Sequence, residues 1–325
     1  MKTKEFIPPY PLKTAVLFLI FNRLDTTKQV FEEIRKAKPP RLYIAADGPR
    51  ENKEGEKEKV GAVRKYVLEN IDWNCEVKTL FRDKNLGCGK AVSQAITWFF
   101  ENEEMGIILE DDCLPSQSFF WFCEKLLKKY NKEKRIMLIT GTSYLFNEIE
   151  RKEDYFFSRY VSIWGWASWR RAWKYYDINM KNWPEIKKNN KIKEIFYWDK
   201  KIAHFFSNCF EIAFNKKIDT WDYQWVYTCF THDGYCLTPY KNLISNIGFK
   251  GTRESKNSPF INMERLDFHN INNLKGPKVI SYNLETDKIL FYNIFYRFQR
   301  YKNINYILRN LNLLEIAKKI KKIYD

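Results

Sequence analysis

The sequence has no Cys-x-x-Cys pair, and its seven cysteines form no recognisable pattern of spacing. An odd number of scattered cysteines argues against a disulfide framework and a zinc site, and it favours a reducing compartment. The beginning of the sequence has no secretory signal, and the apolar run at 15–21 is far too short to cross a bilayer. These absences predict a cytoplasmic protein.

The sequence also lacks a P-loop, a Gly-x-Gly-x-x-Gly fingerprint, an internal repeat and a low-complexity linker. It does have a formal net charge of +16 over 325 residues, and 17% of its residues are aromatic. A charge of this size predicts an anionic partner: nucleic acid, a membrane surface or a phosphate-bearing substrate. The aromatic content suggests a surface for flat or sugar-like ligands, with a tryptophan-rich core as the alternative.

The first 140 residues alternate between strand and helix patterns. Strands are predicted at 15–21, 41–46, 75–81, 106–109 and 135–140, and helices at 25–36, 58–70, 89–101 and 118–130. This alternation is typical of βαβ units, and it predicts an α/β fold with a mainly parallel sheet flanked by helices. Beyond it, 155–176 is crowded with aromatic residues, a helix-rich stretch runs to about 216, and 256–277 is predicted to be a loop.

The end of the sequence is strongly basic. From 288 to 325 it carries nine Lys or Arg residues against two acids. Apolar residues recur there at helical intervals, at Ile304, Ile307, Leu308, Leu311 and Leu314. A basic amphipathic helix of this kind is typical of proteins that lie on an anionic membrane surface. A helix packed on its own domain, with a solvated basic face, fits the pattern equally well.

Three consecutive carboxylates follow one of the predicted strands. In GIILEDDCLPS, the apolar run 107–109 leads directly into Glu110, Asp111 and Asp112. Ligands of an open parallel sheet bind at the carboxyl ends of its strands. Adjacent carboxylates repel one another unless a cation or a hydroxyl lies among them, and oxygen ligands suit Mg²⁺ or Mn²⁺. The alternative is an acidic turn that caps the helix beginning near Ser118.

The other strand ends carry polar signals as well. Arg23 follows the first strand and is suited to a bidentate contact with phosphate. Asp47 follows the second and can accept hydrogen bonds from a base or ribose. The third leads into NLGCGK, where Gly87 and Lys90 stand in a turn that would let a helix N-terminus approach a nucleotide. Each signal alone fits an ordinary turn, but together they favour a nucleotide-binding edge.

Six segments carry a resemblance to a known family: FNRLDTT, AADGPR, NLGCGKAV, ILEDDCLPSQSFFWFC, SIWGWASWRRAW and TWDYQW. Over residues 12–250 the chain resembles GT-A-type glycosyltransferases of the nucleotide-diphospho-sugar transferase superfamily. It is similar in layout to the N-acetylglucosaminyltransferase I family and to the bacterial HlpA-like "hemolytic protein" group. The resemblance implies a GT-A (Rossmann-like) domain at 1–255, with a nucleotide-sugar-binding half at 12–145 and an acceptor half at 146–255. A loop and a basic helical tail follow at 256–325.

The resemblance also implies roles for matching positions. The expected metal ligand is Asp112, for Mn²⁺ or Mg²⁺, and the expected general base is Asp222. The nucleotide-sugar-binding residues are expected to be Arg23, Asp47, Gly87, Lys90, Glu110 and Asp111. The acceptor is expected to contact Trp164, Gly165 and Trp166. Many GT-A enzymes take a further metal ligand from a late histidine, whereas GFKGTRES offers Arg253, which leaves metal dependence open.

The implied reaction transfers a sugar from a nucleoside-diphosphate donor, with UDP as the family default, to a hydroxyl of a glycan or lipid-linked acceptor. It is expected to invert the anomeric centre. The alternatives are a nucleotidyltransferase of the same fold and a non-enzymatic protein that binds anionic membranes or nucleic acid. FNRLDTT counts against the nucleotidyltransferase, which would carry a glycine-rich loop there. Nucleic acid is not expected as a partner, because no recognition motif appears. The tail predicts peripheral attachment to the inner face of a membrane.

Overall fold

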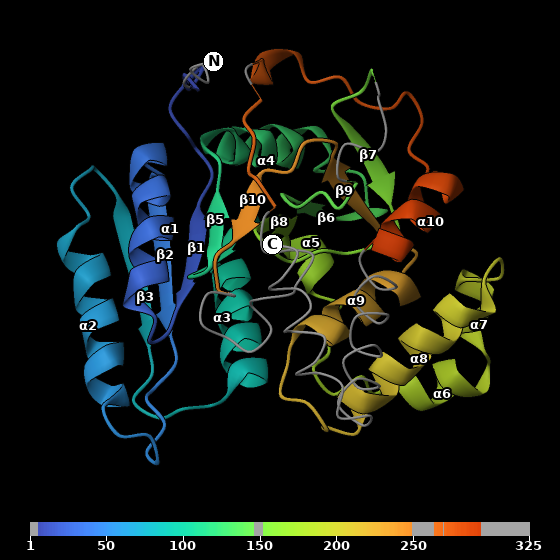
Figure 1. Ribbon diagram of the computed structural model, residues 1–325, viewed down its shortest axis with the longest axis horizontal. Coiled ribbons are helices and arrows are strands. Elements are labelled where there is room, and N and C mark those ends of the chain that lie inside the picture. Colours follow the sequence, from blue (N-terminus) through green and yellow to red (C-terminus); the bar gives the residue numbers. More distant parts are fainter. Residues whose placement is uncertain (1–5, 146–151, 249–262, 269, 294–325) are drawn as a thin grey trace, which may run out of the picture.

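The computed structural model describes residues 6–145, 152–248, 263–268 and 270–293. A large sheet runs through the molecule, with helices on both faces and a group of helices beyond one end (Figure 1). The basic tail from 294 onward lies outside the described residues, as do residues 256–262 and 269 of the predicted loop at 256–277. Among the residues described, no helix is both long and apolar enough to cross a membrane.

The alternation predicted for the first half is confirmed, with element ends within two residues of expectation. The elements are β1 (Val16–Ile20), α1 (Leu24–Ala37), β2 (Arg41–Ala46), α2 (Glu56–Glu69), β3 (Glu76–Phe81), α3 (Cys88–Asn102), β4 (Met105–Glu110), β5 (Cys113–Pro115), α4 (Gln117–Lys129) and β6 (Ile136–Thr140). Strand β5, which has only three residues, was not predicted from the sequence. The apolar run of β1 is completely buried, as expected for a central strand covered on both faces.

The second half adds strands and a group of helices. Its elements are β7 (Tyr155–Ser158), β8 (Trp166–Trp169), α5 (Arg170–Trp173), α6 (Trp183–Lys188), α7 (Lys191–Ile195), α8 (Lys200–Phe214), α9 (Asp222–Thr231), β9 (Tyr235–Pro239), β10 (Ile244–Asn246), a short 3₁₀ turn (Ile271–Asn273) and α10 (Leu284–Phe291). Helix α10 is attached to β7 through the buried Asp287, which accepts hydrogen bonds from the Ser158 hydroxyl (2.6 Å) and the Arg159 backbone N–H (3.1 Å).

The large sheet has eight strands in the order β3-β2-β1-β4-β8-β6-β9-β7. Strands β3, β2, β1 and β4 are parallel, whereas β8 runs antiparallel to both β4 and β6. Both halves of the chain therefore contribute to one sheet. A second, two-stranded sheet pairs β5 with β10, which places Asn246 opposite Cys113, directly after the carboxylate triplet.

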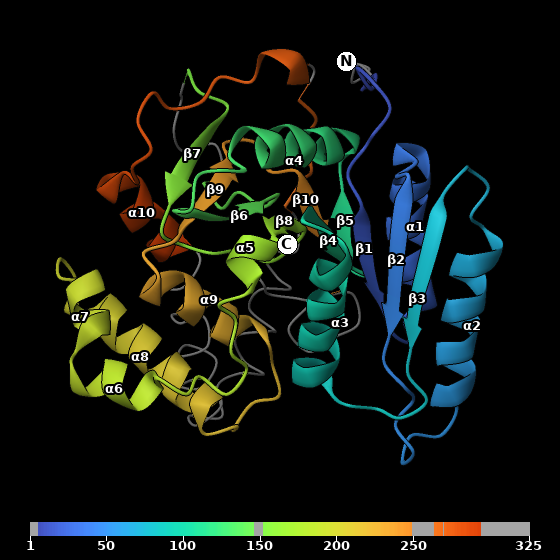
Figure 2. The same ribbon diagram turned by 180° about the vertical axis from the view of Figure 1, so that it is seen from behind.

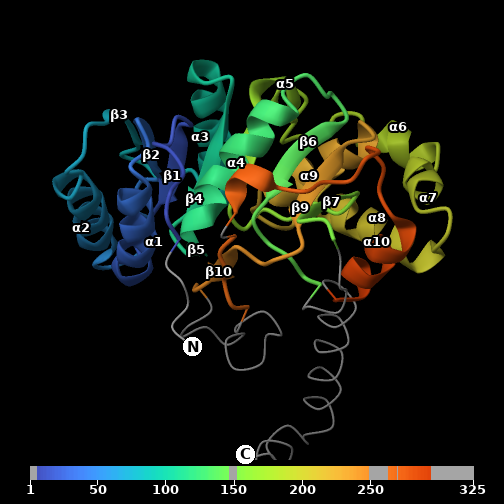
Figure 3. The ribbon, with the colours of Figure 1, turned by 90° about the horizontal axis from the view of Figure 1, so that it is seen from above.

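Each face of the sheet has its own apolar layer. Helices α1, α2 and α4 cover one face, and α3, α5 and α9 cover the other (Figures 2 and 3). Phe31 and Phe119 on the first face and Phe99 on the second are completely buried. Burying a side chain of this size stabilises the fold by about 1.5–3 kcal/mol. These layers fix the carboxyl ends of β1, β2 and β4 next to the N-terminus of α3.

Candidate active site

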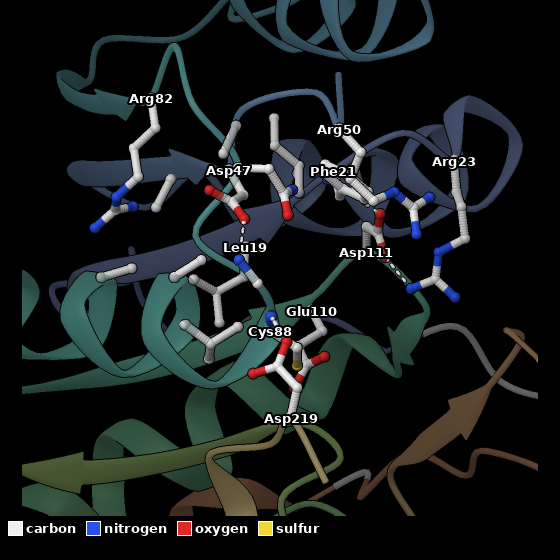
Figure 4. A pocket seen from close by; sticks show the side chains of 18 residues that line it. Leu19, Phe21, Arg23, Asp47, Arg50, Arg82, Cys88, Glu110, Asp111 and Asp219 are labelled. Atoms are coloured by element: carbon white, nitrogen blue, oxygen red, sulfur yellow. Dashed lines mark hydrogen bonds and ion pairs between the residues drawn. The ribbon is translucent and has the colours of Figure 1, made fainter. Parts of the chain in front are cut away.

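A cavity of about 330 Å³ lies at the carboxyl edge of the sheet, beside the start of α3. Its apolar floor comes from β1, β2 and α3 and includes Leu19, Ala45 and Val92. Charged and polar side chains surround this floor: Arg23, Asp47, Arg50, Arg82, Asn85, Glu110, Asp111 and Asp219. Arg82 lies at one end of the cavity and Arg23 at the other (Figure 4). The structure thus brings together four strand ends that the sequence marked separately.

The Arg23 guanidinium bridges two carboxylates of the triplet. It forms an ion pair with Asp111 and a second one with Asp112, where the nitrogen–oxygen distance is 3.0 Å. Asp111 is only 3% exposed, and it also accepts a hydrogen bond from the backbone N–H of Phe21 at 3.4 Å. Glu110, the last residue of β4, makes no side-chain hydrogen bond or ion pair within the described residues.

The triplet holds more negative charge than its surroundings favour. Burial, reinforced by the charges of Asp112, Asp111 and Asp222, raises the pKa of Glu110 to about 8. Burial also raises the pKa of Asp111 to about 6, although Arg23 opposes the change. For Arg23, burial works to lower the pKa, but Asp111 and Asp112 outweigh it and raise the pKa overall. One guanidinium therefore does not neutralise the cluster.

The chemistry of these residues fits a divalent cation that keeps most of its waters. In the described part of the chain, no group of three or more His, Cys, Asp or Glu side chains is arranged to hold a metal. Mg²⁺ commonly binds through one or two carboxylates plus substrate phosphates, and the uncompensated negative charge beside Asp112 suits such an ion. Arg253 lies outside the described residues. Binding of Mn²⁺ or Mg²⁺ at Asp112 stays a prediction.

Asp47 serves the protein backbone in this structure. Its carboxylate accepts hydrogen bonds from the backbone N–H groups of Leu86 (3.0 Å) and Gly87 (3.1 Å). The side-chain amide of Asn85 donates in return to the carbonyl of Gly48 at 2.7 Å. These bonds tie the end of β2 to the turn before α3. Asp47 lines the cavity as expected, but these bonds already occupy the acceptor oxygens that were predicted to meet a base or ribose.

The N-terminus of α3 holds a carboxylate from the second half of the chain. Asp219 accepts hydrogen bonds from the backbone N–H groups of Cys88 (2.8 Å) and Gly89 (2.9 Å). Gly87 adopts a left-handed φ of +80°, and a Cβ there would lie 2.4 Å from Asp219. The turn was predicted to let a nucleotide approach the backbone; in this structure its N–H groups are bonded to Asp219, and nucleotide binding there stays a prediction. Lys90 is exposed and does not line the cavity.

Asp222 is the first residue of α9 and lies close to the cavity without lining it. It accepts hydrogen bonds from the backbone N–H of Tyr223 (2.8 Å) and the hydroxyl of Thr220. The negative charge of Asp222 contributes to the raised pKa of Glu110, although burial and the charges of Asp112 and Asp111 contribute more. Burial, together with Glu110, Asp219 and Asp222, also raises the pKa of the Cys88 thiol to about 12.

The structure does not bring Trp166 to a surface that an acceptor can reach. This side chain is completely buried, and its ring stacks on Trp221 with centroids 5.7 Å apart and packs near Trp173 and Trp225. Gly165 is buried too, and it lies so close to Ile244 that a Cβ at this position would be 2.4 Å from the Ile244 side chain. Trp164 is half-buried. Much of the aromatic segment at 155–176 therefore belongs to a tryptophan-rich core, which was the alternative expectation for the aromatic content.

Two arginines that were not predicted from the sequence occur near the ends of β2 and β3, and one of them, Arg82, lines the cavity. Arg64 donates through Nη2 to the backbone carbonyls of Ala46, Asp47 and Arg82, and so joins the ends of β2 and β3. Arg82 lines the cavity and donates to the side chain of Gln94 at 3.1 Å. Burial lowers the pKa of both guanidinium groups. Neither has a carboxylate within ion-pair distance in the described part of the chain, so the Arg82 end of the cavity favours a ligand that accepts hydrogen bonds.

No family model matches the sequence, and no curated protein matches it. Among solved structures, the chain is similar to HddC from Yersinia pseudotuberculosis, with 11% identity and a TM-score of 0.27. The structure of that protein complexed with GMP-PN gives 13% identity and the same TM-score. Each match covers 39% of this chain and 57% of the HddC chain. A likeness this slight carries no argument about function, which has to rest on the site itself.

Proposed function

We propose that the protein is a nucleotide-sugar-dependent glycosyltransferase of the GT-A type. The observation that carries this proposal is the carboxylate triplet at the carboxyl edge of the sheet, beside a cavity with an arginine at each end. The donor is a UDP-sugar, and the acceptor is a hydroxyl of a glycan or lipid-linked saccharide. The reaction takes place with a divalent cation and inverts the anomeric centre.

The cavity suits the nucleoside part of such a donor. Its volume of about 330 Å³ lies at the small end of the range for ligand pockets, and its floor is apolar. A flat base fits between Ala45 on the sheet and Val92 on α3. Arg82 then donates to the carbonyl oxygens of the base, since Asp47 is already bonded to the turn at 86–87. The diphosphate extends toward Arg23.

The chemical step separates the anomeric carbon from the diphosphate oxygen, so negative charge grows on the leaving group. In this proposal Arg23 stabilises that charge through two donors, which in this structure bond to Asp111 and Asp112. A divalent cation held by Asp112 would supply further electrostatic stabilisation. The excess negative charge of the triplet gives the protein a reason to bind that cation.

The acceptor hydroxyl loses its proton as it attacks the anomeric carbon. We assign the general base to Asp222, whose charge is felt at Glu110 and Cys88 on the cavity wall. The new bond joins the acceptor oxygen to the anomeric carbon, the carbon–diphosphate bond breaks, and the proton passes to Asp222. One displacement of this kind inverts the configuration.

A nucleotidyltransferase is the second candidate, because it would use the same acidic edge. The loop between β1 and α1 argues against it. That loop spans only Phe21, Asn22 and Arg23, has no glycine, and offers a single backbone N–H, that of Phe21, to Asp111. Such a short loop has little backbone with which to surround a triphosphate.

Product analysis distinguishes the two candidates. The purified protein is incubated with UDP-sugars and Mn²⁺, and in parallel with nucleoside triphosphates and sugar 1-phosphates. NMR then follows the products. A glycosyltransferase slowly transfers the sugar to water, releasing UDP and a sugar of inverted configuration, and Asp222→Asn reduces this rate at least about tenfold. Release of pyrophosphate from the second mixture alone would replace the proposal with the nucleotidyltransferase.

A further inference from the structure

A second and larger cavity, of about 840 Å³, lies among α6, α7 and α8. These helices stand beyond the end of the sheet that is far from α2 (Figure 1). One face of α8 forms a wall of the cavity through Lys200, His204, Asn208 and Glu211. We call this cavity the three-helix groove. The reaction described above uses none of its residues.

Aromatic side chains give the groove a firm floor and an exposed rim. Trp183 and Phe196 are each 1% exposed and form part of the floor. Tyr197, next in sequence to Phe196, is 71% exposed on the rim. Core packing does not explain a tyrosine so exposed beside a cavity. The negative face of an aromatic ring, bordered by polar groups, suits the C–H faces of a pyranose.

Planar polar groups in the groove are held in fixed orientations. The Glu211 carboxylate accepts hydrogen bonds from the Trp183 indole (2.8 Å) and the Lys187 ammonium (2.9 Å). The His204 ring and the Asn208 side-chain amide are hydrogen-bonded at 3.0 Å. Fixed amide, imidazole and carboxylate groups can pair with ring hydroxyls without losing much side-chain entropy.

The charge of the groove is not balanced. Lys187 is paired with Glu211, and Glu194 is paired with Lys191. Lys193 and Lys200 also line the groove, and neither has an acidic partner within ion-pair distance among the residues described. Two lysines beside an aromatic rim favour a ligand that combines sugar rings with negative charge.

We propose that the three-helix groove binds an acidic oligosaccharide. Resting on the proposed function, this oligosaccharide is the non-reacting part of the acceptor glycan. The volume of the groove falls within the range of ligand pockets, toward the upper end. Helix α8 packs both against α7 and against α9, whose first residue is Asp222. The glycan site and the assigned base therefore belong to one packed group of helices.

The test is calorimetric titration of the full chain with tetragalacturonate, an acidic tetrasaccharide, and with maltotetraose as its neutral counterpart. Tyr197→Ala is compared with Tyr175→Ala, an exposed tyrosine outside the groove. The double variant Lys193→Ala/Lys200→Ala is compared with Lys57→Ala/Lys59→Ala on α2. Thermal melting checks that each variant is folded.

We expect the wild type to bind tetragalacturonate saturably and to bind maltotetraose at least about tenfold more weakly. Each groove variant should bind tetragalacturonate at least about tenfold more weakly than the wild type, and both control variants should bind it as the wild type does. A chain with a net charge of +16 also attracts polyanions non-specifically. Binding that is abolished by added salt and unaffected by Tyr197→Ala is of that kind and overturns the proposal, as does the absence of binding. UDP titrated into the same samples tests the donor site separately. Loss of UDP binding would count against the proposed function, whereas loss of tetragalacturonate binding alone would count against the groove.

Discussion

Replacing Arg23 tests whether the carboxylate triplet is an electrostatic site or an acidic turn. Arg23→Met keeps the length of the side chain and removes the cation that bridges Asp111 and Asp112. Asp111 is 3% exposed and would lose its counter-ion, whereas Arg23 itself is 43% exposed and solvent screens part of its effect. Breaking a fully buried ion pair costs about 3–5 kcal/mol of stability. Because solvent screens part of this pair, we expect Arg23→Met to lower the free energy of unfolding by roughly 2 kcal/mol at pH 8.

The loss should depend on pH with a definite sign. In the wild type the pKa of Asp111 is raised to about 6, so its carboxyl is mostly protonated at pH 5 and ionised at pH 8. Arg23 stabilises chiefly the ionised form. The destabilisation caused by Arg23→Met therefore grows as pH rises through about 6. For a protein of this size, 2 kcal/mol corresponds to a decrease in Tm of roughly 3 °C.

Thermal melting of both proteins between pH 5 and pH 8 measures this effect. The matched control is Arg35→Met, which breaks an exposed pair with Asp72 and should lower the melting temperature much less than Arg23→Met does at pH 8. Calorimetry adds a second reading, because Arg23→Met should also weaken UDP binding at least about tenfold. If Arg23→Met and Arg35→Met melt alike at every pH, the electrostatic reasoning about the triplet is refuted.

Three further predictions concern single contacts. Asp219→Ala removes the hydrogen-bond acceptor at the start of α3 and should lower the free energy of unfolding by about 1 kcal/mol, whereas Asp219→Asn should keep most of that stability. Thermal melting measures the loss, and faster amide exchange at 86–90 locates it. Arg82→Ala should weaken UDP binding in calorimetry and change stability by no more than about 0.5 kcal/mol. Burial raises the pKa of Asp287 to about 7 from its ordinary 3.8, so its contribution to stability is fully present below pH 4 and is lost as pH rises through 7. Melting temperatures should therefore shift in favour of Asp287→Asn as pH rises from 5 to 8, and a pH-independent difference would contradict this.

The sequence predicted well what depends on neighbouring residues. Apolar runs separated by amphipathic stretches located β1 to β4 and the helices between them, because such patterns reflect local burial. The same reasoning placed Glu110, Asp111 and Asp112 at a strand end, since strand ends in a parallel sheet share an edge. Arg23 and Asp47 reached the same cavity for that reason.

The sequence could not reveal contacts between distant segments. Strand β8 inserts between β4 and β6 although it follows both in the chain. Asp219 caps α3 across a separation of 130 residues, and nothing local distinguishes it from its neighbour Asp222. Trp166 was expected at the acceptor because an aromatic run does not show which of its rings face the core. The packing of α5, α9 and the residue before α9 against the sheet buries that side chain.

The central claim is that the triplet and its cavity bind a nucleoside diphosphate with a divalent cation. Calorimetric titration with UDP, with and without Mn²⁺, tests it most directly on the wild type, on Asp112→Asn and on the exposed control Asp25→Asn. The account predicts micromolar binding that needs Mn²⁺, is lost in Asp112→Asn and is kept in Asp25→Asn. It is contradicted if no nucleoside diphosphate binds, or if Asp112→Asn lowers only the melting temperature and leaves UDP binding unchanged.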